Sequence, residues 1–323
     1  MDGRPVAARA AITAHNLALE SELLRVHAAF VQAGIQTVVL KGLPLMRRIG
    51  EEISQRRLAD NDLLVHREDV RPAAALLAEL GYEHAHRRPL DVSLRTGSGQ
   101  HPMVQEVAGH RLCVELHWEA FHPPFIGIDP GLIWSHAESQ VFRDQDLLVF
   151  DRPLTLVHTA AHFVWHAMGQ PRLLRTLGNA WMRFRDSVAL SELRALAHAT
   201  GTLHALDFSL RSAQRLSFAE GVPNLGSSRA RALERILPAE RLLEDRPNPD
   251  YDRILLSLLL LSPRRAAWHM GSLLVPAPTQ AAVVAGSTSP GRIALHYLGR
   301  PTRTAARWLR YRFSQRTRRS PED

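Results

Sequence analysis

The fold is decided by the stretch Thr37–Gly42 (TVVLKG) together with Leu58–Val65 (LADNDLLV), which follows it. Gln36–Leu40 is rich in β-branched residues and predicts a strand, as does the apolar run Asn61–Val65. Between them, Lys41 and Gly42 end the first strand, and a helix is expected from Leu43 to Ile49. Further strands are predicted after a Gly/Ser loop within 91–110 and at Arg111–Trp118 (RLCVELHW).

Helical patterns surround these strands. Apolar residues recur at helical spacing over 11–33 and over Glu68–Leu80, which begins with acidic residues and is followed by Gly81. After Pro123 and Pro124 the chain is rich in Leu, Ala and Arg, and helices are expected over about 154–168, 172–200, 203–217, 228–245, 251–272 and 291–313. The pattern predicts an α+β fold, with a small mixed sheet and flanking helices at 1–122 and a mainly helical domain at 123–323.

Composition excludes several classes of protein. Apolar residues make up 45% and charged residues 22% of the 323, as in a globular protein rather than a disordered one. The single cysteine, Cys113, cannot form an intramolecular disulfide. No signal peptide is apparent, and the longest apolar stretch, Ile254–Leu261, is far shorter than a membrane span. A cytoplasmic location is expected.

The net charge of +8 indicates an acidic partner, but much of it lies in the arginines between Arg292 and Arg319. Nucleic acid is therefore not the expected partner of the body. The basic segment 291–313 is expected to be a terminal helix docked on the body, with peripheral membrane contact as the alternative. Lys41 is the only lysine among 40 Lys and Arg residues. Its compact ammonium reaches phosphates where a guanidinium does not fit, which favours a chemical role over chance.

Asp60 and Asp62 carry the candidate chemistry. Side chains two apart on a strand point to the same side, so the two carboxylates are expected to lie close together. Their repulsion is relieved by a cation, and oxygen ligands of this kind suit Mg²⁺ or Mn²⁺. Glu115 on a neighbouring strand is the best candidate for a third ligand. Asp-x-Asp alone also occurs in exposed loops, so the pair gains weight only from its surroundings.

Those surroundings resemble a phosphate site. Gly42 lets the backbone approach a phosphate at the start of a helix, and Lys41 adds positive charge there. Arg56 and Arg57 precede Asp60 and are further candidates, with Arg57 the one expected to bind nucleotide. In the later helix, His158, His162 and His166 share one face. His158 and His162 are candidates for an acceptor cleft, with simple packing as the alternative. His117 is expected to face away from the metal side and support the sheet.

VVLKG, RRLADNDLLV and VELHW together resemble the nucleotidyltransferase family with a Leu-Lys-Gly and Asp-x-Asp-Leu-Leu-Val signature, a branch of the polymerase-β-like superfamily. LVHTAAHFVWH and ALHYLGRPTR also resemble segments of that family. The resemblance implies that Asp60, Asp62 and Glu115 bind two divalent metals. The wider superfamily has Gly-Ser at the phosphate turn, whereas Leu43 follows Gly42 here, so Lys41 and backbone amides would replace that serine.

The expected activity is transfer of a nucleoside monophosphate from a nucleoside triphosphate, with ATP as the expected donor, to an unidentified small-molecule, peptide or protein acceptor. Mg²⁺ or Mn²⁺ would assist, and pyrophosphate would leave. The alternative is a non-catalytic accessory or binding protein that keeps the same fold in a peptide or natural-product pathway. The missing serine at the phosphate turn is the feature that favours this alternative.

Overall fold

The computed structural model describes residues 6–85, 89–96, 99–122, 125, 127–166, 170–237 and 239–243, and a few isolated residues beyond these ranges. By their internal contacts, the residues form two compact units. The first comprises Met1–His122, Ile126–His158 and Asn179–Leu196, and the second Pro123–Phe125, Thr159–Gly178 and Ala197–Asp323. Each unit is described by itself.

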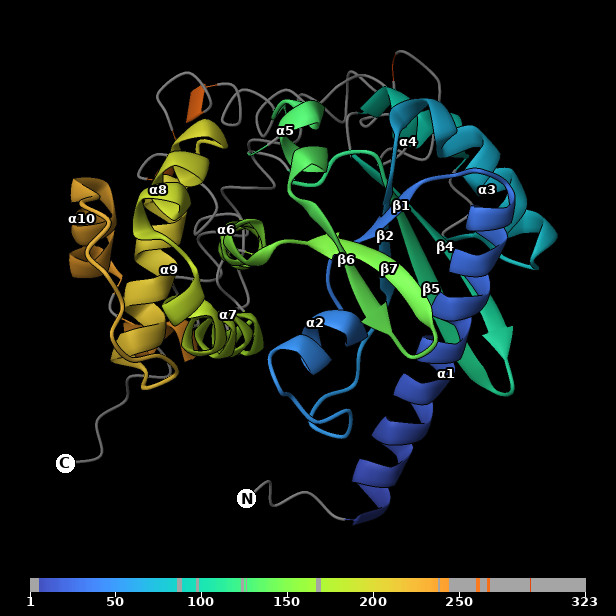
Figure 1. Ribbon diagram of the computed structural model, residues 1–323, viewed down its shortest axis with the longest axis horizontal. Helices are drawn as coiled ribbons and strands as arrows, with labels where there is room; N and C mark the ends of the chain where they lie inside the picture. The colour runs from blue at the N-terminus through green and yellow to red at the C-terminus, as the bar shows by residue number, and fades with distance from the viewer. Residues whose placement is uncertain are drawn as a thin grey trace. The chain divides into compact units, whose positions relative to one another are not determined.

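A mixed sheet is the centre of the first unit (Figure 1), and its strands run in the order β3-β4-β5-β2-β1-β7-β6. The strands are β1 (Thr37–Val39), β2 (Asn61–Val65), β3 (Glu83–His84), β4 (Gln100–Val107), β5 (His110–His117), β6 (Ala137–Phe142) and β7 (Gln145–Phe150). β2 is antiparallel to β1 and parallel to β5, and β1 is parallel to β7. The strands predicted at Gln36–Leu40, Asn61–Val65 and Arg111–Trp118 are therefore adjacent in the sheet, at its middle.

One face of the sheet is covered by α1 (Val6–Gln32) and α3 (Val70–Glu79), which contact each other and β5. Helix α1 buries Leu19, Leu23, Val26 and Phe30, which are spaced by three or four residues and so lie on one side of the helix. Alternate residues of β2 and β5 join the same core, among them Leu63, Val65, Leu112, Val114 and Leu116. Asp62, Glu115 and His117 alternate with these residues, so they lie on the other face of the sheet.

Short helices complete this unit. α2 (Leu43–Arg48) follows β1, a 3₁₀ turn (Arg67–Asp69) leads into α3, and α4 (Leu90–Thr96) and α5 (Pro130–Ser135) lie in the connections between strands. Strands β6 and β7 were not expected from the sequence, and they extend the sheet past residue 122. They fall within 122–150, where the texture of the sequence changes.

Helices make up the described part of the second unit. α6 (Arg152–Trp165), α7 (Pro171–Phe184) and α8 (Leu190–Ala199) each have residues in both units, while α9 (Leu203–Arg215) and α10 (Ser228–Ile236) pack together within the second. Gly178 of α7 allows a close approach, because a Cβ there would lie 2.3 Å from the carbonyl oxygen of Phe218.

The α+β class predicted from the sequence is confirmed. The helices expected at 11–33, 43–49, 154–168 and 203–217 are present within a few residues, and the prediction at 172–200 covers both α7 and α8. Most of 251–272 and 291–313, including the ALHYLGRPTR segment, lies outside the described residues. No helix in the described part of the chain has the length and hydrophobicity needed to span a membrane.

Candidate functional site

Asp60, Asp62 and Lys41 come together because β1 and β2 are antiparallel neighbours. Asp62 is the second residue of β2 and its side chain is fully buried, while Asp60 directly precedes the strand. The backbone N–H of Leu40 donates to the carbonyl of Asp62 at 3.1 Å, which holds the end of β1 beside the pair. Lys41 Nζ then lies 2.9 Å from Asp62 Oδ2 and 3.3 Å from Asp60 Oδ1.

Glu115 reaches the same place from β5. This strand is parallel to β2, and Glu115 is the direct neighbour of Asp62 across the pairing. Its Oε2 accepts a hydrogen bond from Gln100 Nε2 on β4 at 3.0 Å, so the third strand in this row orients the carboxylate.

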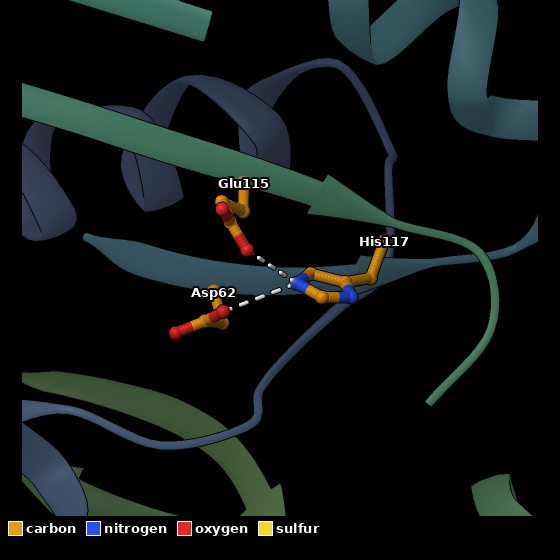
Figure 2. Close-up of side chains that lie close together, drawn as sticks. All are labelled: Asp62, Glu115 and His117. Atoms are coloured by element: carbon orange, nitrogen blue, oxygen red, sulfur yellow. Dashed lines mark hydrogen bonds and ion pairs between the residues drawn. The ribbon is translucent and has the colours of Figure 1, made fainter. Parts of the chain in front are cut away.

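His117 also faces this site, and the expectation that it faces away is wrong. Its Nε2 lies 3.1 Å from Asp62 Oδ1 and 3.6 Å from Glu115 Oε2. Figure 2 shows the ring nitrogen directed toward both carboxylates. Glu115 and His117 are two residues apart on one strand, so they share a face by the same alternation that pairs Asp60 with Asp62. Strand alternation applied to VELHW would have identified His117 from the sequence.

The charges in this cluster shift one another's pKa values. Burial would raise the pKa of Asp62, but Lys41 and His117 outweigh it and hold the pKa well below its usual value. Burial would likewise lower the pKa of Lys41, yet Asp62 and Asp60 raise it. Burial and the neighbouring Asp62 raise the pKa of Asp60 to about 6. Of the two aspartates, Asp60 is therefore the one that protonates first as the pH falls.

Histidines border the carboxylates. Burial would lower the pKa of His117, but hydrogen bonds to Asp62 and Glu115 raise it to about 9. The His122 ring lies edge-on to His117 with centroids 5.7 Å apart. His158 packs edge-on against Phe121 and Phe150, each at 5.4 Å between centroids. Burial lowers the pKa of His158 to about 4 and that of His122 well below its usual value. These two rings are neutral and His117 is cationic at pH 7.

The turn after β1 is built as the sequence predicts. Gly42 has φ +84°, a backbone conformation that residues with a side chain rarely adopt. Its carbonyl accepts a hydrogen bond from the N–H of Met46 at 3.0 Å in the first turn of α2. Leu43 is buried in the core of the α1 face. It offers no polar group, so Lys41 and the backbone N–H groups are the donors that this turn supplies.

The donor set fits a divalent cation. Asp62, Glu115 and His117 each offer one ligand atom, and these atoms lie within 4.8 Å of one another. Two carboxylates and an imidazole are common metal ligands, and burial of Asp62 makes its charge dependent on a cation.

Comparison with known proteins gives the same direction. Residues 6–217, more than half of the chain, match a family model described as an uncharacterised nucleotidyltransferase. The chain belongs to this nucleotidyltransferase family. No curated protein and no solved structure gives a significant match. The matched region includes the whole sheet and every residue of the site. The chain is therefore an enzyme of this nucleotidyltransferase family, and the match covers the part that carries the cluster.

The remaining residues singled out in the nucleotidyltransferase sequence are placed as follows. The Arg57 guanidinium lies 3.3 Å from His15 Nδ1 on α1. His158 belongs to the first unit and lies close enough to Asp62 and Lys41 for their charges to affect its pKa. His162 belongs to the second unit, where its ring lies edge-on to His166 at 4.6 Å. The nucleotide role of Arg57 and the acceptor role of the two histidines stay predictions.

Proposed function

We propose that this enzyme transfers a nucleoside monophosphate from a nucleoside triphosphate, with ATP as the expected donor, to an acceptor oxygen, and that pyrophosphate leaves. The observation that carries the proposal is the convergence of Lys41, Asp62, Glu115 and His117 from three adjacent strands. A polymerase-β-like nucleotidyltransferase needs positive charge for the triphosphate and carboxylates for divalent cations, and both are present here within a few ångströms.

Asp60, Asp62 and Glu115 are the proposed metal ligands, with Mg²⁺ or Mn²⁺ as the ion. When bound, such ions stabilise the charge on the entering and leaving oxygens of an in-line displacement. Asp62 is held rigid by the sheet and by burial, so it is the fixed ligand, while Asp60 precedes the strand and is partly exposed.

Lys41 has two roles in this proposal. Without nucleotide, its ammonium balances the two aspartates at 2.9 and 3.3 Å. With nucleotide and cations present, the aspartates are neutralised by the cations, and the same ammonium is available to a phosphate oxygen. Gly42 has positive φ and carries no side chain, so backbone N–H groups can approach the phosphates at this turn.

The test compares two matched pairs of substitutions. Asp60→Asn with Asp62→Asn removes both charges of the site while keeping side-chain volume. Asp144→Asn with Asp146→Asn does the same to another Asp-x-Asp pair, which is exposed in and beside the β6–β7 turn. Titration calorimetry with a non-hydrolysable ATP analogue and Mg²⁺ or Mn²⁺ should show binding in the wild type and in the control pair, and none in the site pair.

Unchanged analogue affinity in a folded Asp60→Asn/Asp62→Asn variant would refute the site. Absence of any binding by the wild type would instead favour an accessory protein. A pyrophosphate-release assay with candidate small molecules and peptides then identifies the acceptor, because release depends on an acceptor only when transfer takes place.

A further inference from the structure

His117 brings a nitrogen ligand to a site whose other ligands are oxygens. Its side chain is only 2% exposed, and its Nε2 is directed between the carboxylates of Asp62 and Glu115 (Figure 2). The imidazole belongs to the rigid sheet, because it is the last residue of β5 and pairs with Leu64 of β2. It is therefore fixed in place before any ion arrives.

The spacing of these atoms matches ligands that share one ion. Ligands about 2.1 Å from an ion lie about 3.0 Å apart at a right angle and about 3.4 Å apart in a tetrahedron. The observed separations from His117 Nε2 are 3.1 Å to Asp62 Oδ1 and 3.6 Å to Glu115 Oε2. Both separations from His117 Nε2 therefore fit an ion shared by this nitrogen and a carboxylate oxygen.

Asp62 divides its two oxygens between two neighbours. Lys41 Nζ holds Oδ2, whereas His117 lies beside Oδ1. An ion can therefore bind through Oδ1 without first displacing Lys41 from Oδ2. On binding, the ion would take the position of the proton on His117 Nε2, and that proton would pass to solvent.

We propose that His117 Nε2 is a direct ligand of the ion held by Asp62 and Glu115, and that it makes the site prefer first-row transition ions over Mg²⁺. This inference rests on the proposed function, since it concerns the same metal site. Magnesium favours oxygen ligands and binds nitrogen weakly. Transition ions gain affinity from imidazole, and the gain increases from Mn²⁺ to Co²⁺.

The test uses the full-length protein with Mn²⁺, Co²⁺ and Mg²⁺ as probes, in the presence of the non-hydrolysable ATP analogue. The Mn²⁺ signal in electron paramagnetic resonance should show coupling to a ¹⁴N nucleus in the wild type. His117→Gln replaces the nitrogen ligand with an amide and should abolish that coupling. His66→Gln is the matched control, because His66 follows the far end of β2 and contacts Gln36 instead.

Affinity ratios supply a second measurement. The wild type should bind Co²⁺ more tightly than Mn²⁺, and Mn²⁺ more tightly than Mg²⁺, and the Co²⁺ to Mg²⁺ ratio should fall about tenfold or more in His117→Gln. All ions compete with the same proton on His117 at a given pH, so their ratio cancels that competition. It also cancels any general loss of folded protein.

Each outcome of these measurements bears on the role of His117 or on the proposed function. Nitrogen coupling that survives in His117→Gln, or an unchanged ion ratio, overturns the role of His117 and leaves the proposed function standing. Failure of the wild type to bind any of the ions overturns both.

A His117→Gln variant that does not fold is replaced by a second experiment. Labelling all histidines with ¹⁵N shows whether the coupled nitrogen is a histidine nitrogen. His122→Gln and His158→Gln then test the other described rings that interact with Asp62. Coupling retained in both variants assigns it to His117, and coupling lost in either overturns the assignment.

Discussion

Lys41 Nζ lies 2.9 Å from Asp62 Oδ2, and the aspartate side chain has no exposure to solvent. A carboxylate in that position needs a cation at all times, because an unpaired buried charge is costly. In the absence of a divalent ion the lysine meets this need.

Removal of the lysine should therefore destabilise the protein. Lys41→Ala leaves the buried Asp62 with His117 alone, and the free energy of unfolding should fall by about 3–5 kcal/mol, the usual cost of removing one partner of a buried pair. Chemical denaturation at pH 7 without divalent ions measures the loss. Added Mn²⁺ should restore part of the stability. A loss below about 1 kcal/mol would show that the ion pair does not support the fold.

Asp60 should make the protein less stable as pH rises. Its pKa is raised from 3.8 to about 6, so between these values the unfolded chain gives up a proton that the folded protein keeps. This group therefore costs stability above pH 6 and costs nothing below pH 3.8. Asp60→Asn should raise the free energy of unfolding at pH 8 by up to about 3 kcal/mol, and by less at pH 5. Denaturation curves of both proteins at the two pH values give the comparison, and an equal difference at both would contradict the shift.

His117 should show a different pH dependence. Its pKa is raised from 6.5 to about 9, so its charged form stabilises the fold fully below pH 6.5, and that contribution is lost as pH rises to 9. The wild type should lose up to about 3 kcal/mol over this range, and His117→Gln should not. Chemical shifts of histidine ring protons in an NMR titration give the pKa directly. A value near 6.5 would remove the basis of this expectation.

Alanine substitutions at Gly42 and Gly50 distinguish the conformational cost of replacing a glycine from an effect on nucleotide binding. Both have positive φ, at +84° and +77°, and neither Cβ would meet a close neighbour. Gly42 also has ψ −141°, a region that is essentially restricted to glycine, so Gly42→Ala should cost about 1–3 kcal/mol and Gly50→Ala a similar or smaller amount. Only Gly42→Ala should also weaken binding of the ATP analogue, because Gly42 is in the turn beside Lys41. Equal affinities of Gly42→Ala and Gly50→Ala for the ATP analogue would show that the turn at Gly42 does not contact the nucleotide.

Local patterns sufficed to predict the centre of the sheet. Asn61–Val65 was predicted with the bounds that the structure has, because a short apolar run lies between polar residues on both sides. The proximity of Lys41 to Asp60 and Asp62 also followed, since two short strands joined by one helix pair with each other. The strands β6 and β7 were missed because ESQVF and QDLLVF mix polar and apolar residues beside a segment with a helical pattern. Strand β7 is defined by its pairing with β1, a contact over more than one hundred residues that no local pattern contains, and β6 by its pairing with β7.

Pairing of β1 with β7 has a consequence for how the enzyme is made. Strand β1 has β2 on one edge and β7 on the other, and Val38 and Val39 are matched to Leu148 and Val149. During synthesis, β1 and β2 leave the ribosome well before β7. Until then the backbone N–H and C=O groups on the second edge of β1 are unpaired, and such an edge can pair with a strand of another chain. A fragment that stops at His122 should therefore aggregate, and the strand that leads to Lys41 gains its second neighbour only after residue 150 has been translated.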